Sequence, residues 1–187
     1  MNEQYAELIT KFPLFAGHTA HGAQLLLERG AVQEFSPGEV LCREGDAGSF
    51  VLLVLAGTVE VFVERQGQAL VLTEVGPGTI LGELAVLCGI PRAASLRTAG
   101  DVVVLNWRND AFRRILLGNA FLAERILANS LRTVIEKEQA LINSLTAKAI
   151  GSVQSAEGAE PGQATASAEP AAVNESGQPT TRITQPH

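Results

Sequence analysis

The chain has 187 residues, of which 46% are hydrophobic and 18% are charged, so it can bury a core and is not a wholly disordered chain. Its 14 basic and 20 acidic residues give a net charge of −6 without a polybasic block, which argues against a nucleic-acid partner because phosphate backbones bind clustered Lys and Arg. Apolar runs are too short to cross a membrane, and the first ten residues lack a signal-peptide pattern. We therefore expect a cytoplasmic protein without a membrane partner, in which Cys42 and Cys88 are reduced thiols.

Two short helices are predicted at the start of the chain. Residues 2–9 and residues 19–29 carry apolar side chains at helical spacing. Pro13 lies between them, and proline ends a helix that precedes it.

Residues 31–107 have the pattern of a β-domain. Turn signals such as Ser36-Pro37-Gly38 and Gly76-Pro77-Gly78 recur at short intervals, and β-branched stretches lie between them. In residues 59–64, Val alternates with Glu or Phe, which indicates a half-buried strand. Short strands separated by regular turns are typical of a jelly-roll barrel. The predicted fold class is therefore mainly β, with helices on both flanks.

Two helices are predicted after the barrel. Asn109 or Asp110 can cap a short helix through Leu117, and Asn119 can cap a long helix that runs to about Lys148.

The long helix carries a stripe of residues at alternating steps of four and three, which is the spacing of a coiled-coil seam. Its members are Leu127, Leu131, Val134, Glu138, Leu141 and Leu145. The stripe predicts a parallel homodimer through residues 119–148, although packing on the chain's own barrel would also satisfy it.

The composition changes at about residue 150. Residues 151–187 are rich in Ala, Ser, Gly and Pro, and their few large aliphatic side chains cannot offset the entropy lost on folding. We predict one domain over residues 1–150, with the barrel at about 31–107 and the C-terminal helices at about 108–148, followed by a disordered tail over 151–187. The tail is a tether, or it carries a docking motif near residues 180–187.

The candidate ligand-binding residues lie in residues 76–96, GPGTILGELAVLCGIPRAASL. Gly82 lets the backbone approach a ligand closely, and the helix start at Glu83 offers amides to an anion. Arg92 offers a forked cation to a phosphate, whereas Glu83 can accept a hydrogen bond from a ribose hydroxyl. These residues predict a nucleotide site, with a salt bridge between Glu83 and Arg92 as the alternative.

The segments Gly82-Glu83-Leu84-Ala85 and Pro91-Arg92-Ala93-Ala94-Ser95 resemble the phosphate-binding cassette of the cyclic nucleotide-binding domain. That domain is found in bacterial catabolite activator proteins and in regulatory subunits of cAMP-dependent protein kinase. The resemblance continues in Phe12-Pro13-Leu14-Phe15, in residues 35–39 and in Arg43-Glu44-Gly45-Asp46, and it covers about 145 residues.

The resemblance implies that Glu83 accepts the ribose 2′-hydroxyl and that Arg92 pairs with the cyclic phosphate, while backbone amides complete the anion cradle. The implied ligand-binding residues are Gly82, Glu83, Leu84, Ala85, Arg92, Ala93 and Ala94. Ala93 lacks the hydroxyl that cGMP-selective relatives often place beside the arginine, which favours cAMP and leaves cGMP as the other candidate.

Family members commonly cover the base with a residue of the last helix, often an aromatic or a small hydroxyl residue. This chain has no aromatic residue after Phe121. Helical position makes these residues the candidate base lid, from the same subunit or a partner: Val134, Lys137, Glu138 and Leu141.

The predicted function is a non-catalytic cAMP sensor that signals through its C-terminal helix to a separate, unidentified protein partner. The resemblance implies a stand-alone bacterial member without the DNA-binding domain. A ligand-free dimeric adaptor of the same fold is the alternative. A cupin-type metalloenzyme fits less well, since His18, His21 and His187 all lie outside the predicted strands, so neither a metal nor a cofactor is expected.

Overall fold

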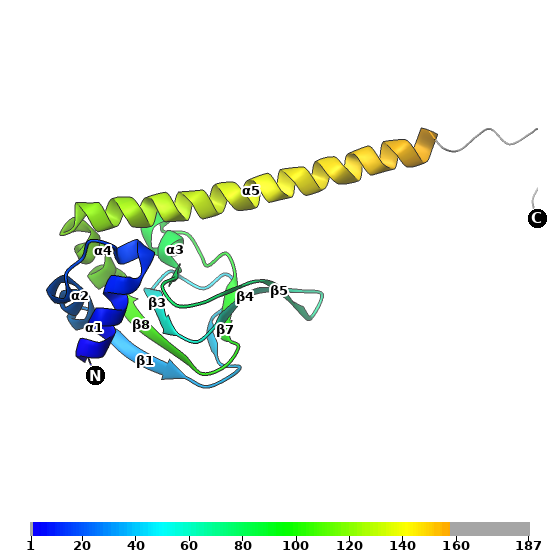
Figure 1. Ribbon diagram of the computed structural model, residues 1–187. Helices are drawn as coiled ribbons and strands as arrows, with labels where there is room; N and C mark the ends of the chain where they lie inside the picture. Colours follow the sequence, from blue (N-terminus) through cyan, green and yellow to red (C-terminus); the bar gives the residue numbers. More distant parts are fainter. Residues whose placement is uncertain (1, 158–187) are drawn as a thin grey trace, which may run out of the picture. The chain divides into compact units, whose positions relative to one another are not determined.

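The computed structural model describes residues 2–157 of the chain. The chain divides into two compact units, of which the first ends at Ala140 and the second begins at Leu141. Over the described residues, eight antiparallel strands form two four-stranded sheets with the orders β1-β8-β3-β6 and β2-β7-β4-β5. The predicted jelly-roll-type β-fold with flanking helices is confirmed (Figure 1).

The elements follow the predicted order along the chain. The strands are β1 (Ala31–Phe35), β2 (Val40–Cys42), β3 (Phe50–Ala56), β4 (Val59–Arg65), β5 (Gln68–Val75), β6 (Ile80–Leu81), β7 (Ser95–Thr98) and β8 (Val102–Arg108). The helices are α1 (Asn2–Lys11), the short 3-10 helix η1 (Pro13–Phe15), α2 (Ala20–Glu28), α3 (Glu83–Cys88), α4 (Asn109–Leu117) and α5 (Ala120–Glu157).

Strand β3 is buried on both faces. Val51, Leu53 and Leu55 face a core that the flanking helices cover, whereas Leu52 and Val54 face the core between the two sheets. Because side chains alternate along a strand, burial on both faces requires a continuous apolar run, and residues 50–56 read FVLLVLA.

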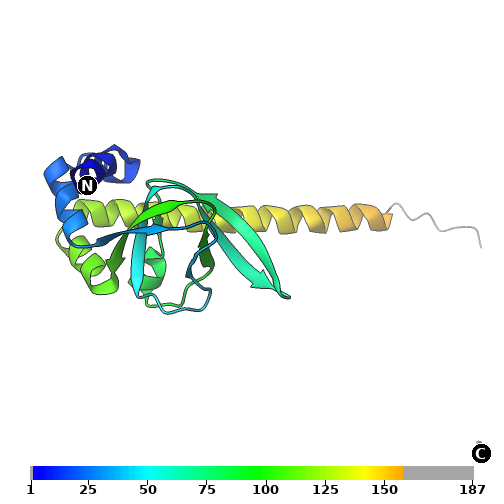
Figure 2. The same cartoon turned by 90° about the horizontal axis from the view of Figure 1, so that it is seen from below.

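Helices α1, α2 and α4 gather at one end of the β-structure, and the β4–β5 hairpin extends at the other (Figures 1 and 2). Trp107 lies in their shared core with Phe112 and Ile126, and its indole nitrogen donates to the Leu26 carbonyl at 2.9 Å. Burying each large apolar side chain of this kind stabilises the fold by about 1.5–3 kcal/mol. This core fixes the first turns of α5, and residues 129–137 of that helix then line the site.

The two predicted helix caps have different outcomes. The Asn119 cap is confirmed, since its Oδ1 accepts from the Leu122 amide at 3.0 Å. The cap by Asn109 or Asp110 is wrong, because α4 begins at Asn109 after Arg108 without a side-chain cap. Asn109 instead donates its side-chain amide to the Gly48 carbonyl at 3.1 Å, a long-range contact that local sequence does not encode.

Helix α5 ends at Glu157, beyond the predicted end near residue 148. Residues 151–157, the first seven residues of the predicted tail, belong to this helix, and no proline occurs before Pro161 to end it. The rest of the predicted tail, residues 158–187, lies outside the described residues. No helix within residues 2–157 is both long and apolar enough to cross a membrane.

Two predicted surfaces also differ in detail. Phe62 of β4 is only 2% exposed although the alternation placed it outward, because the Arg97 guanidinium lies over its ring at 4.9 Å. On α5, Leu127, Leu131 and Val134 are 45%, 60% and 45% exposed, so the chain itself covers this part of the stripe only partly.

Candidate functional site

A cavity of about 410 Å³ lies where β-strands, α3 and α5 meet. Its walls are the strand residues Cys42, Val61, Thr73, Val75 and Leu96, residues 79–85 and 90–94, and Asn129, Ser130, Thr133, Val134 and Lys137 of α5. All seven residues predicted to bind the ligand line this one cavity. Of the predicted base lid, Val134 and Lys137 line it, Glu138 does not, and Leu141 belongs to the second unit.

Arg92 is the buried cation of the cavity, with 4% of its surface exposed. Its Nη1 donates to the Gly82 carbonyl at 2.8 Å and its Nη2 to the Phe50 carbonyl at 2.6 Å. The guanidinium also lies 4.5 Å from the centre of the Phe50 ring, which adds a cation–π attraction. Its Nε is buried and has no hydrogen-bond partner within residues 2–157. A buried donor in this state is costly unless a ligand or water satisfies it.

The turn formed by residues 43–46 holds the backbone of Arg92. The Arg92 amide donates to the Asp46 carbonyl at 2.8 Å, and the Gly45 amide donates to the Arg92 carbonyl at 2.9 Å. Gly45 has a φ of +87°, which glycine adopts readily and other residues do not. A turn at Gly45-Asp46 is predicted from the sequence, but its bonds to Arg92 are not, because Arg92 lies more than 40 residues away.

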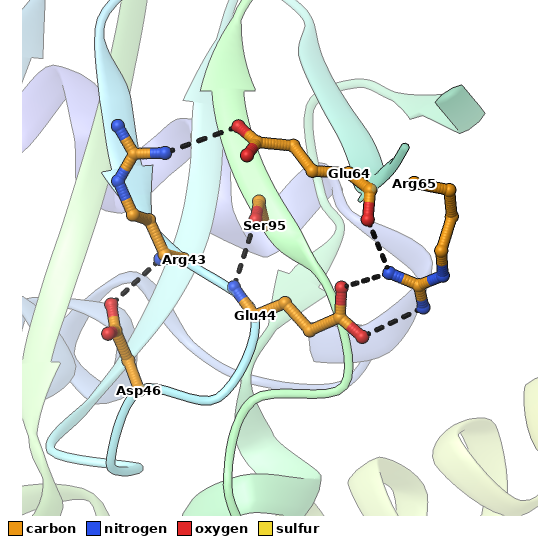
Figure 3. A network of polar contacts seen from close by, with 6 residues as sticks. All are labelled: Arg43, Glu44, Asp46, Glu64, Arg65 and Ser95. Atoms are coloured by element: carbon orange, nitrogen blue, oxygen red, sulfur yellow. Dashed lines mark hydrogen bonds and ion pairs between the residues drawn. The ribbon is translucent and has the colours of Figure 1, made fainter. Parts of the chain in front are cut away.

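A polar network outside the cavity supports this turn (Figure 3). The Arg43 amide donates to the Asp46 carboxylate at 2.8 Å, and the Glu44 amide donates to the Ser95 hydroxyl at 2.9 Å. The Glu44 carboxylate receives two bonds from the Arg65 guanidinium, at 2.7 and 2.9 Å. Arg65 thereby lowers the pKa of Glu44 below its ordinary value. The turn is thus tied to both β4 and β7.

Gly82 explains why the start of α3 and Arg92 can lie so close together. Its φ is +82°, and a Cβ built on it would lie 1.8 Å from Nη1 of Arg92. Only glycine satisfies both the backbone conformation and the contact at this position.

Glu83 does not pair with Arg92 in the part of the chain that the structure describes. Its Oε1 instead accepts a hydrogen bond from the Ser130 hydroxyl of α5 at 2.7 Å. Ser130 is 3% exposed and was missed by the sequence analysis. Its position four residues before Val134 places both on one face of the helix, and this spacing was the signal available in the sequence.

Cys42 lies in the cavity wall beside Arg92 but supplies no reactive thiolate. Burial raises the pKa of its thiol and outweighs the nearby Arg92 charge, which lowers it. Within the described residues, no group of three His, Cys, Asp or Glu side chains could hold a metal ion. His187 lies outside those residues.

The arrangement matches a known family. The family model of the cyclic nucleotide-binding domain matches residues 32–119, which include the turn, Gly82, Glu83 and Arg92. Over these residues the chain matches the cyclic nucleotide-binding domain family. The predicted resemblance is therefore confirmed.

The chain is similar to regulatory subunits of cAMP-dependent protein kinase. A cAMP-dependent protein kinase regulatory subunit from Hypocrea atroviridis is 32% identical over 112 residues, which cover 60% of this chain and 23% of that protein. The chain spans about a quarter of the length of the first curated relatives that it matches.

Solved structures agree with this assignment. The catabolite activator protein of Thermus thermophilus superposes with a TM-score of 0.65 at 26% identity, covering 72% of this chain and 63% of that one. The regulatory domain of Toxoplasma gondii PKA, solved with cAMP, superposes with a TM-score of 0.54 at 26% identity and covers 61% of this chain and 44% of that one.

Proposed function

We propose that the domain is a non-catalytic sensor that binds a cyclic nucleotide, with cAMP as the preferred ligand, in the 410 Å³ cavity. The observation that carries the proposal is the buried Arg92, whose Nε lacks a partner within residues 2–157. A cyclic phosphate would accept this hydrogen bond and neutralise the cation, and a charge-assisted bond of this kind contributes about 1.5–3 kcal/mol.

The remaining lining fits a nucleoside. Glu83 lines the cavity as a hydrogen-bond acceptor for the ribose 2′-hydroxyl, and its negative charge keeps it away from the phosphate. Val61, Val75 and Leu96 supply apolar surface for a base. Ala93 offers no hydroxyl to a guanine, which supports the preference for cAMP. A cavity of this size lies within the range of about 300–1,000 Å³ for small-molecule sites.

Helix α5 is the output element in this proposal. It lines the cavity through five residues of unit 1 and also exposes Leu127, Leu131 and Val134. Exposed apolar residues at seam spacing favour a homodimer through α5, and the signal then passes to a separate protein partner. Sedimentation velocity of the full chain tests the dimer, and a purely monomeric species would contradict it.

Calorimetry with the full chain tests the ligand. We expect cAMP to bind more tightly than cGMP, and 5′-AMP to bind weakly because it lacks the cyclic phosphate. Arg92→Ala removes the buried cation, and we expect it to weaken cAMP binding by about 2–4 kcal/mol, or roughly 30- to 1,000-fold. Arg108→Ala is the matched control, because the Arg108 side chain is 89% exposed. Absence of binding to any cyclic nucleotide would instead favour a ligand-free adaptor.

A further inference from the structure

Ser130 makes a contact that the proposed nucleotide site does not itself explain. Its hydroxyl donates to Oε1 of Glu83 at 2.7 Å across 47 residues of sequence. Within residues 3–140, this is the only side-chain hydrogen bond that joins α5 to residues 82–94. It therefore links the helix directly to the carboxylate proposed to bind ribose.

The other hydroxyl groups of α5 that the structure describes form hydrogen bonds within the helix. Thr133 donates to the Asn129 carbonyl at 3.1 Å, and Thr146 donates to the Ile142 carbonyl at 2.9 Å, so both bond back to their own helix. This is the usual behaviour of Ser and Thr within helices. Ser130, which is 3% exposed, donates its hydrogen bond to the Glu83 carboxylate instead.

We infer that Ser130 is a positioning residue, which holds the Glu83 carboxylate where it accepts the ribose 2′-hydroxyl. The inference rests on the proposed function. A carboxylate has two oxygens and about four acceptor positions, so one bond from Ser130 leaves room for a hydroxyl of the ligand. Glu83 has three side-chain torsions, and a bond that fixes them reduces the conformational entropy lost when the ribose binds.

The same bond makes ribose recognition depend on the position of α5. A change in α5 that moves Ser130 releases Glu83, and a ligand that engages Glu83 favours the helix position that keeps the bond. This reciprocal dependence is what couples a ligand site to an output element.

The test compares two ligands that differ in one hydroxyl. Dissociation constants for cAMP and 2′-deoxy-cAMP are measured by calorimetry on the full chain, for the wild type, Ser130→Ala and Ser130→Thr. We expect Ser130→Ala to weaken cAMP binding about 3- to 10-fold and to leave 2′-deoxy-cAMP binding unchanged. Ser130→Thr keeps the hydroxyl and restores the cAMP affinity. Ser144→Ala is the matched control, since it makes the same substitution on the same helix at a residue that does not line the cavity and donates to the Leu141 carbonyl.

A double-mutant cycle provides a second measurement. In the Glu83→Ala background, Ser130→Ala should no longer change cAMP binding, because the positioned group is gone. Equal weakening of both nucleotides by Ser130→Ala would overturn the positioning role and leave the proposed function intact. Failure of the wild type to bind cAMP at all would overturn the proposed function, and the inference with it.

Discussion

Arg92 and Glu83 lie in the same cavity, but different parts of the chain hold them. The backbone of Arg92 is bonded to the turn at residues 43–46, and its side chain is bonded to the carbonyls of Gly82 and Phe50. All of these partners belong to the barrel and its connections. The Glu83 carboxylate is instead bonded to Ser130, which belongs to α5.

This difference separates two tasks. A cation fixed by backbone bonds within the barrel keeps its position whatever α5 does, so it suits the capture of an anion. A carboxylate that depends on a helix reports the position of that helix. We therefore expect substitutions at the phosphate end to change affinity most, and substitutions on α5 to change selectivity and coupling.

The largest effect is expected for Gly82→Ala. The added Cβ would lie 1.8 Å from Nη1 of Arg92 and would require a backbone φ of +82°, so the guanidinium must leave its place. We expect cAMP affinity, measured by calorimetry, to fall by more than about 100-fold.

Gly89→Ala is the control for Gly82→Ala at the other end of α3. Gly89 also has a positive φ, of +67°, but a Cβ there meets nothing within 4 Å. Gly89→Ala should therefore lower Tm through backbone strain but leave the affinity for cAMP unchanged. Equal loss of binding in both variants would mean that strain in α3, and not the contact with Arg92, limits affinity.

A smaller effect is expected for Lys137→Met at the α5 side of the cavity. Lys137 is the one cation that the described part of α5 contributes to the lining, and an ammonium favours the acceptor edge of guanine over the amino group of adenine. We expect the affinity for cGMP to fall about 2- to 5-fold while cAMP binding changes little. Glu138→Ala is the neighbouring control, since Glu138 does not line the cavity. An altered cAMP affinity in Glu138→Ala would show that the base reaches further along α5.

The smallest effect is expected outside the cavity, at the Glu44–Arg65 pair. The hydrogen bond from Arg65 lowers the pKa of Glu44, so the stabilisation is present above the ordinary carboxyl pKa of about 4.3 and is lost as the pH falls through the lower folded-state value. We expect Glu44→Gln to reduce Tm by about 1–3 °C at pH 7. The difference from the wild type should disappear in more acidic buffer, and a difference that persists there would show that the carboxylate is not its source.

Sequence reasoning worked where the chemistry is local. Gly82, Glu83 and Arg92 lie within eleven residues, so their types predict a nucleotide site or a Glu83–Arg92 salt bridge, and the resemblance favours the nucleotide site. The strands and turns were also predicted, because alternation and glycine placement are local signals.

Prediction from the sequence failed where a residue's main contact lies far away in the chain. Ser130 was missed because nothing in its neighbourhood shows that Glu83 lies opposite. Asn109 was predicted to cap α4, but its side chain bonds to Gly48, a contact that the sequence does not show. Alternation placed Phe62 on the outer face, but the Arg97 guanidinium covers its ring. These contacts are set by tertiary packing, which propensity does not record.

The stacking of Arg92 on Phe50 has one further consequence. The Arg92 guanidinium contacts an aromatic ring and two carbonyls, which hold its side chain in one rotamer. An anion therefore binds to a cation that is already ordered, and less conformational entropy is lost on binding. Lysine could carry the same charge to this point, but it has neither a planar face for the ring nor a fork for two carbonyls. Arg92→Lys would therefore keep the positive charge but lose the contacts with the Phe50 ring and the two carbonyls that hold it in place.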